Sequence, residues 1–233
     1  MKRTVVIHQP DFVPYLGFFN RFLEADLYVA LDHVQFVNGT SCSWTHRDKI
    51  KTPAGEKWLT LSVKKAGRNT PINHIELSDT VDWAEKNLRL LKENYLKAPY
   101  YAEIMPKVEA LYRTPTLLLV DFNLQFIDLL MDILDLRIPI LLSSNLAPEG
   151  RKNELLINLL QKVGATHYLS GVGAKKYMEP ELFKRAGLTV VWQDFAQPIY
   201  PQQYGDFLPN LSTLDVLFNC GIHGSQKILR GKK

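Results

Sequence analysis

The stretch Thr4-Val5-Val6-Ile7-His8-Gln9-Pro10 lies near the start of the chain and indicates the class of its fold. Its β-branched residues favour a strand, and the polar turn that begins at His8 ends that strand. Apolar residues recur at helical spacing over residues 15–24, and Leu27-Tyr28-Val29-Ala30-Leu31 is a second short apolar run. A strand, a helix and a strand in this order predict two parallel strands joined by a helical crossover.

The same alternation returns in the last third of the chain. Residues 138–143, 166–170 and 188–193 are short apolar runs, as expected of strands that are buried on both faces. Residues 153–163 and 174–186 lie between these runs and carry helical spacing. We therefore predict an α/β fold with a doubly wound, mostly parallel five-stranded sheet of Rossmann-like architecture.

The middle of the chain interrupts this alternation. Residues 44–51 and 58–63 flank the turn Pro53-Ala54-Gly55-Glu56, which predicts a β-hairpin. Helical spacing then continues up to residue 134. The predicted organisation is a sheet domain formed by residues 1–36 and 137–233, a β-hairpin insertion at residues 37–70, and a helical segment at residues 71–136 that packs on the same core.

The composition narrows the possible classes of protein. Of the 233 residues, 46% are hydrophobic and 22% are charged, which is typical of a globular protein with a sizeable core. The net charge of +4 is modest and comes from basic residues at the C-terminus, including Lys232 and Lys233, so nucleic-acid binding is not expected. The two cysteines, Cys42 and Cys220, show neither CxxC spacing nor a disulfide framework, which indicates a reducing compartment.

Residues 116–134 are apolar enough to resemble a membrane span. However, Asp121, Asp128 and Asp132 recur there on one face of the predicted helix, and carboxylates are costly in lipid. The segment therefore predicts a core helix with one solvated face. The apolar run at the N-terminus is too short for a signal peptide, so we expect a cytoplasmic protein without a membrane span.

Polar residues follow the predicted strands of the sheet. His8 and Gln9 follow the first, Asp32 follows the second, and Ser170-Gly171-Val172-Gly173 follows the fourth. Ligands bind at the carboxyl ends of the strands in an open α/β sheet, so these residues are expected to share one binding edge. His8 could act as an acid or base there, and Asp32 could hold a ligand. The structural alternatives are a histidine that satisfies a turn and an aspartate that caps a loop.

Three further groups are chemically notable. Gly171 and Gly173 would let the backbone approach a phosphate or carboxylate, although glycine turns are also common without a ligand. Arg47 and Lys49 share one face of the predicted hairpin, where they could bind a phosphate or form a solvated charged surface. Cys220 is a candidate nucleophile, and a buried inert thiol is its alternative.

Several motifs resemble the WbqC-like protein family. They are His8-Gln9-Pro10, Asp32-His33-Val34-Gln35-Phe36 and Arg47 near the start, then Tyr168-Leu169-Ser170-Gly171 and Leu214-Asp215-Val216-Leu217-Phe218-Asn219-Cys220-Gly221 towards the end. The resemblance covers nearly the whole chain. It departs from the family pattern at His46, where asparagine is expected, and at Gln197, where histidine is expected.

The resemblance implies a role in the biosynthesis of O-antigen or related bacterial surface polysaccharides, with glycine transfer as one activity. It also implies a set of candidate site residues, which are His8, Gln9, Asp32, Gln35, Arg47 and Asn219.

Together these observations lead to one main functional hypothesis, the transfer of an aminoacyl or acyl group, such as glycyl, to a nucleotide-linked amino sugar. His8 and Asp32 are the predicted catalytic residues. The residues predicted to bind the small anionic substrate, such as a nucleotide sugar, are Gln9, Gln35, Arg47, Lys49, Ser170, Gly171, Gly173 and Asn219. No metal site is predicted, and the sequence identifies neither a cofactor nor an oligomeric state.

Two alternatives remain open. The His8 turn after the first strand is similar to that of nucleotidylyltransferase-like enzymes, although the second histidine of their HxGH signature is missing. The chain could also be a non-catalytic module that binds a nucleotide sugar.

Overall fold

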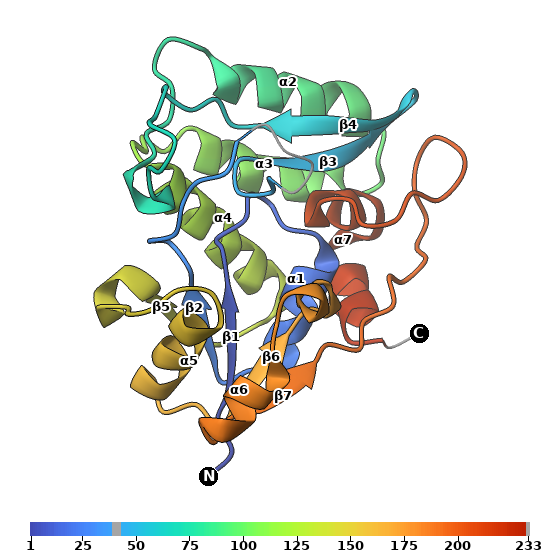
Figure 1. The fold of residues 1–233 in the computed structure, drawn as a ribbon. Helices are drawn as coiled ribbons and strands as arrows, with labels where there is room; N and C mark the ends of the chain where they lie inside the picture. The colour runs from blue at the N-terminus through green and yellow to red at the C-terminus, as the bar shows by residue number, and fades with distance from the viewer. Residues whose placement is uncertain (39–42, 232–233) are drawn as a thin grey trace. The chain divides into compact units, whose positions relative to one another are not determined.

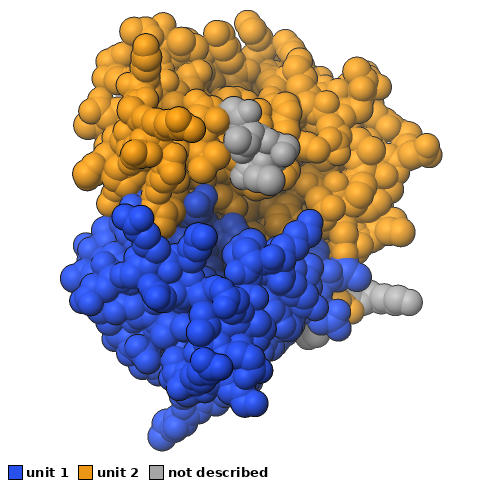
Figure 2. Space-filling model, in the orientation of Figure 1, with its two compact units in different colours: residues 1–9, 20–33, 136–196 blue, residues 10–19, 34–135, 197–233 orange. Residues whose placement is uncertain are grey.

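The computed structural model describes residues 1–38 and 43–231, and the chain divides into two compact units. Unit 1 comprises residues 1–9, 20–33 and 136–196, and unit 2 comprises residues 10–19, 34–135 and 197–233 (Figure 2). The described residues do not include Cys42, Lys232 and Lys233. The expected redox compartment rests partly on Cys42, and the expected source of the net charge rests partly on the two lysines.

Unit 1 contains a five-stranded sheet with the strand order β5-β2-β1-β6-β7 (Figure 1). All four pairs of neighbouring strands are parallel, which confirms the predicted α/β sheet. The strands are β1 (Thr4–His8), β2 (Leu27–Ala30), β5 (Ile140–Leu142), β6 (His167–Ser170) and β7 (Thr189–Trp192). The helical elements of unit 1 are η1 (Arg21–Leu23), η3 (Ser143–Leu146), α5 (Asn153–Lys162), η4 (Val172–Lys176) and α6 (Pro180–Arg185). Helix α1 (Leu16–Asn20) lies between β1 and β2 along the chain, and residues 16–19 of it belong to unit 2.

The core of unit 1 explains why its strands lack a polar face. Val5 and Val29 belong to a buried cluster that includes Leu159 of α5 and Phe183 of α6. The alternate residue Tyr28 points to the opposite face, where its ring lies 5.0 Å from that of Phe22 in η1. The sheet is therefore covered on both faces, as a doubly wound fold requires.

The segment predicted as one helix over residues 174–186 is divided in the structure. It forms the short 3₁₀ helix η4 and the helix α6, which begins at Pro180. The residue before a proline is disfavoured in the helical conformation, and Glu179 accordingly has φ −109° and ψ 88°. The single helix was thus a wrong prediction, and the proline is its physical reason.

Unit 2 combines a β-hairpin with helices. β3 (Arg47–Thr52) and β4 (Gly55–Thr60) pair in antiparallel register, which confirms the predicted hairpin (Figure 1). Its helices are η2 (Ile72–His74), α2 (Trp83–Tyr95), α3 (Tyr101–Tyr112), α4 (Leu119–Leu134) and α7 (Thr213–Leu229), and α7 packs against both α3 and α4.

The predicted solvated face of α4 is present. Asp121, Asp128 and Asp132 are exposed, whereas Phe122 and Phe126 on the opposite side are fully buried. Among residues 1–38 and 43–231, no helix combines the length and the apolar character needed to cross a bilayer.

Candidate functional site

The carboxyl edge of the sheet in unit 1 brings several candidate residues together. Because all the strands run in one direction, His8 at the end of β1, Asp32 after β2 and Ser170 at the end of β6 lie at the same edge. Ser143 follows β5 and Gln193 follows β7 at that edge as well. Asp32, Ser143 and Ser170 are almost completely buried.

Asp32 is held by a dense set of hydrogen bonds from the start of η3. Its Oδ1 accepts from Ser143 Oγ at 2.8 Å and from the Ser144 amide at 2.9 Å, and its Oδ2 accepts from Ser144 Oγ at 2.6 Å. Burial acts to raise the pKa of Asp32, but these bonds to the charged form outweigh it and leave the pKa below its usual value. Asp32 is therefore a carboxylate at neutral pH.

The same bonds determine which nitrogen of His33 carries a proton. Ser143 Oγ gives its single proton to the Asp32 carboxylate, which can only accept. The contact of 2.6 Å between Ser143 Oγ and His33 Nδ1 must therefore use a proton on Nδ1. This leaves Nε2 of the neutral ring without a proton. Asp32, Ser143 and His33 thus form a hydrogen-bonded relay that ends in a potential base.

The electrostatics of His33 suit this role. Burial lowers the pKa of the ring, and the nearby charge of Asp32 partly counteracts that shift. His33 is therefore neutral at physiological pH and able to accept a proton, while Asp32 would stabilise the cation that forms. His33 is only partly buried, so a ligand can reach it more easily than it can reach Ser143.

His8 has a different environment. Its Nδ1 lies 3.0 Å from the carbonyl oxygen of Gln9 and donates to it, because a carbonyl can only accept. Burial and the charge of Arg21 lower the pKa of His8 to about 3. The ring stays neutral, so its part in the site would be to form hydrogen bonds rather than to take up protons. The catalytic role of His8 and the ligand contact of Gln9 both stay predictions.

Arg21 places a positive charge close to the ends of β1 and β6. Only 4% of the residue is exposed, and its charge acts on both His8 and Tyr168. A Cβ added at Gly171 would lie 4.0 Å from Arg21 Nη1 and 4.0 Å from Gln193 Oε1. A ligand that lies against the bare backbone of Gly171 would thus meet a guanidinium donor and an amide acceptor. Gly173 lies further along, in the exposed part of η4.

The remaining predicted ligand contacts belong to unit 2. Arg47 and Lys49 do share one face of β3, and their charged groups lie 4.2 Å and 5.3 Å from the centre of the Trp58 ring. Lys49 also pairs with Glu56 across the hairpin. Gln35 is exposed and donates to the Arg68 carbonyl at 2.6 Å. The ligand contacts of Gln35, Arg47 and Lys49 stay predictions.

Asn219 and Cys220 lie in α7, beside a buried polar network. The Asp215 carboxylate accepts from the hydroxyls of Tyr95 at 2.7 Å and Tyr200 at 2.9 Å. Asn219 Nδ2 donates to the backbone carbonyl of Asp215 at 2.8 Å, which is a bond within the helix. Burial, together with the charge of Asp215, raises the pKa of Cys220 to about 11. These features favour a structural role and the inert-thiol alternative for Cys220.

The sequence assigned no role in the site to His33, Ser143 or Arg21. Ser143 lies 111 positions from Asp32 along the chain, so no local pattern could reveal their bond. The only signal for His33 in the sequence was its position just after a strand. Many loop residues share such a position, so it does not identify a site residue.

Comparison with known proteins gives a consistent relationship along nearly the whole chain. The model of the WbqC-like protein family matches residues 9–227. A relative from Mycobacterium tuberculosis (strain ATCC 25618 / H37Rv), described as "Uncharacterized protein Rv1507c", is 31% identical over 226 residues, which are 95% of each chain. No solved structure matches the chain significantly.

Proposed function

Because the chain belongs to the WbqC-like protein family, we propose that it is a transferase that moves an aminoacyl or acyl group, such as glycyl, to the amine of a nucleotide-linked amino sugar in surface-polysaccharide biosynthesis. The observation that carries the proposal is the relay of Asp32, Ser143 and His33 at the carboxyl edge of the sheet. Acyl transfer to an amine needs a base where the substrate binds, and His33 supplies one whose ring is already oriented.

In the proposed reaction, the sugar amine attacks the carbonyl carbon of the acyl donor, and a carbon–nitrogen bond forms. His33 Nε2 takes the proton that the amine loses, and the ionised Asp32 stabilises the resulting imidazolium through Ser143. The bond between the acyl carbon and its leaving group then breaks, and His33 returns the proton to that group. No oxidant or reductant is required.

Arg21 and the backbone around Gly171 are suited to hold negative charge during this reaction. The guanidinium lies close to the point where a ligand would meet Gly171, so it could stabilise the oxyanion of the tetrahedral intermediate. In this proposal, neutral His8 contributes a hydrogen bond to the substrate.

Mass spectrometry of reaction mixtures tests the proposal. The protein is incubated with nucleotide-linked amino sugars and a panel of activated acyl and aminoacyl donors, and the acylated sugar is quantified. The wild type is expected to form product, and His33→Gln is expected to form at least about a hundredfold less, because general-base catalysis contributes on that order.

His167→Gln is the matched control. His167 begins β6 and therefore lies at the opposite, amino edge of the same sheet, where its Nδ1 contacts Thr166 Oγ1 at 2.8 Å. This variant is expected to retain activity. Binding of nucleotide sugars without any product would favour the binding module. Release of pyrophosphate from a nucleoside triphosphate and a sugar phosphate would favour the nucleotidylyltransferase alternative.

A further inference from the structure

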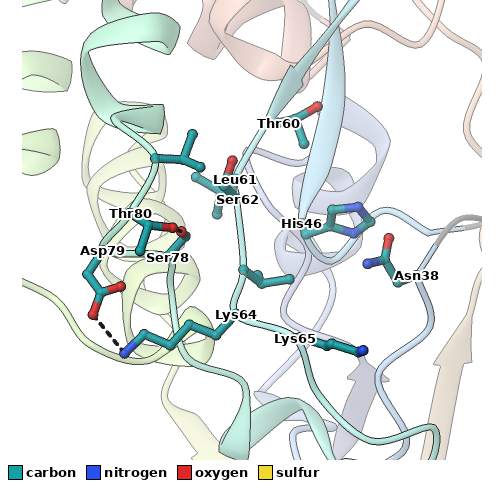
Figure 3. Close-up of a pocket in the computed structure, with 12 residues that line it drawn as sticks. Asn38, His46, Thr60, Leu61, Ser62, Lys64, Lys65, Ser78, Asp79 and Thr80 are labelled. Atoms are coloured by element: carbon teal, nitrogen blue, oxygen red, sulfur yellow. Dashed lines mark hydrogen bonds and ion pairs between the residues drawn. The ribbon is translucent and has the colours of Figure 1, made fainter.

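Unit 2 contains a pocket of about 660 Å³ that the proposed reaction does not use (Figure 3). Its walls are the segments at residues 60–65 and 78–81, and His46 and Asn38 complete the lining. The two segments are joined by backbone bonds, with the Ser78 amide donating to the Ser62 carbonyl at 2.8 Å. The two segments that form the walls are therefore held together by backbone hydrogen bonds. The volume of the pocket lies in the range of small-molecule binding sites.

Four residues that line this pocket carry hydroxyl groups. Thr60, Ser62, Ser78 and Thr80 all line it, and the hydroxyls of Ser78 and Thr80 lie 3.2 Å apart. Each hydroxyl can donate one hydrogen bond and accept two. Such a lining matches a ligand that itself carries several hydroxyls, because donor and acceptor roles can be exchanged between the two partners.

His46 adds an acceptor to the pocket. Ser43 Oγ gives its proton to the Val37 carbonyl, which can only accept, so the contact of 3.0 Å between Ser43 Oγ and His46 Nδ1 uses a proton on Nδ1. Nε2 of the neutral ring is therefore an acceptor. Burial and the charge of Arg47 lower the pKa of His46 to about 4, so the ring stays neutral at physiological pH. A ligand that meets Nε2 must offer a hydrogen-bond donor.

The two lysines of the pocket differ in their partners. Lys64 Nζ pairs with Asp79 at 2.9 Å (Figure 3). It also pairs with Glu76 at 3.0 Å, so its charge is compensated. Lys65 is exposed and has no ion pair with any of the residues in the described ranges 1–38 and 43–231. The positive charge of Lys65 is therefore available to an anionic group of a ligand.

We propose that this pocket is a second binding site, for a small anion that carries several hydroxyl groups. Its anionic group lies at Lys65, and its hydroxyls face Thr60, Ser62, Ser78, Thr80 and His46. The anionic group is a carboxylate or a phosphate, since a lysine ammonium can donate hydrogen bonds to either. This inference goes beyond the proposed transferase reaction and concerns residues of unit 2 only.

Titration of the full-length, ¹⁵N-labelled protein tests the site. The probes are glucose 1-phosphate, gluconate, neutral glucose and inorganic phosphate, each up to about 20 mM, which detects affinities in the millimolar range. Glucose 1-phosphate or gluconate is expected to bind saturably and to shift the amide signals of Ser62, Lys65 and Ser78. Glucose and inorganic phosphate are expected to bind more weakly, because each lacks one of the two recognised features.

Two variants locate the contacts. Lys65→Gln is expected to weaken binding of the anionic probe about threefold, which is typical of an exposed ion pair, and Ser62→Ala about fivefold. Lys57→Gln is the matched control, because Lys57 is an exposed lysine of β4 outside the pocket lining.

Three results would overturn the proposal. They are the absence of saturable binding of both anionic probes, equal effects of Lys65→Gln and Lys57→Gln, and equally strong binding of glucose or inorganic phosphate. Since activity is not measured, none of these outcomes depends on the proposed transferase reaction.

Discussion

Replacing Gly221 by alanine probes the backbone of α7 at the motif Phe218-Asn219-Cys220-Gly221. Gly221 has φ 68° and ψ −179° inside the helix, where the chain is kinked. A Cβ at this position would lie 2.5 Å from Cδ1 and 2.6 Å from Cε1 of the Tyr100 ring. The Tyr100 amide donates to the Phe218 carbonyl at 3.1 Å, so the backbone of Tyr100 is held next to the kink. The substitution therefore meets both a backbone obstacle and a steric obstacle.

The two obstacles can be given magnitudes. A non-glycine residue in this region of φ and ψ costs about 1–3 kcal/mol, and overpacking costs about 1–3 kcal/mol more. Alanine offsets about 0.5–1 kcal/mol of this by reducing the entropy of the unfolded chain. Gly221→Ala is therefore expected to lower the free energy of unfolding by about 1–5.5 kcal/mol. Urea unfolding followed by tryptophan fluorescence measures this change.

Two companion variants separate the causes. Gly224→Ala is the control in the same helix: its Cβ would lie 3.2 Å from Cys220 Cβ without a positive φ, so a change within about 1 kcal/mol is expected. Adding Tyr100→Ala to Gly221→Ala should recover the steric part and leave the backbone part. Equal unfolding free energies for Gly221→Ala and the wild type would refute the reasoning, because neither obstacle could then be present.

Three other predictions follow from the polar groups. Tyr95→Phe removes a hydroxyl that donates to the buried Asp215 carboxylate and should lower the free energy of unfolding by about 2–4 kcal/mol in urea titrations. The pKa of Cys220 is raised to about 11, so only a fraction of about 10⁻³ of the thiol is ionised at pH 8 and its reaction with iodoacetamide should be slow. The rate should rise about tenfold for each pH unit above pH 8. Rapid labelling at neutral pH would contradict this. Asp32→Asn removes the charge that raises the pKa of His33, so the acidic limb of the pH–rate profile should move to lower pH, and a shift to higher pH would exclude His33 as the base.

The architecture of unit 1 was predictable because strand burial is recorded in local sequence. Thr4–His8 and Leu27–Ala30 contain apolar residues at successive positions, and such runs form strands buried on both faces. Pro180 in the sequence also indicated that a helix cannot continue through Glu179. Helical spacing of apolar residues on both sides nevertheless led to the prediction of one helix over residues 174–186. Local patterns therefore located the strands better than the helix boundaries.

The candidate site was predictable only as an edge of the sheet. The sequence placed His8, Asp32 and Gly171 after parallel strands, which suffices to bring them to one edge. It could not indicate that Ser143 bonds to both Asp32 and His33, because those bonds join segments more than a hundred residues apart. Nor could it distinguish the environments that keep His8 and His33 neutral for partly different reasons, since burial and neighbouring charges depend on tertiary packing.

Asp32 has a structural and a functional interpretation, and its two serine partners allow them to be separated. Ser143 and Ser144 each donate a hydroxyl to its carboxylate, so losing either weakens the cap on η3 by at least about 1 kcal/mol. The buried Ser143 also accepts from the Asp32 amide at 3.1 Å, so its loss is expected to cost more stability. Only Ser143 also contacts His33. If Asp32 merely caps the turn, Ser143→Ala and Ser144→Ala should change stability and nucleotide-sugar acylation in parallel. If it orients a base, Ser143→Ala should lower the acylation rate far more, relative to its loss of stability, than Ser144→Ala does, because only Ser143→Ala leaves His33 Nδ1 without its acceptor.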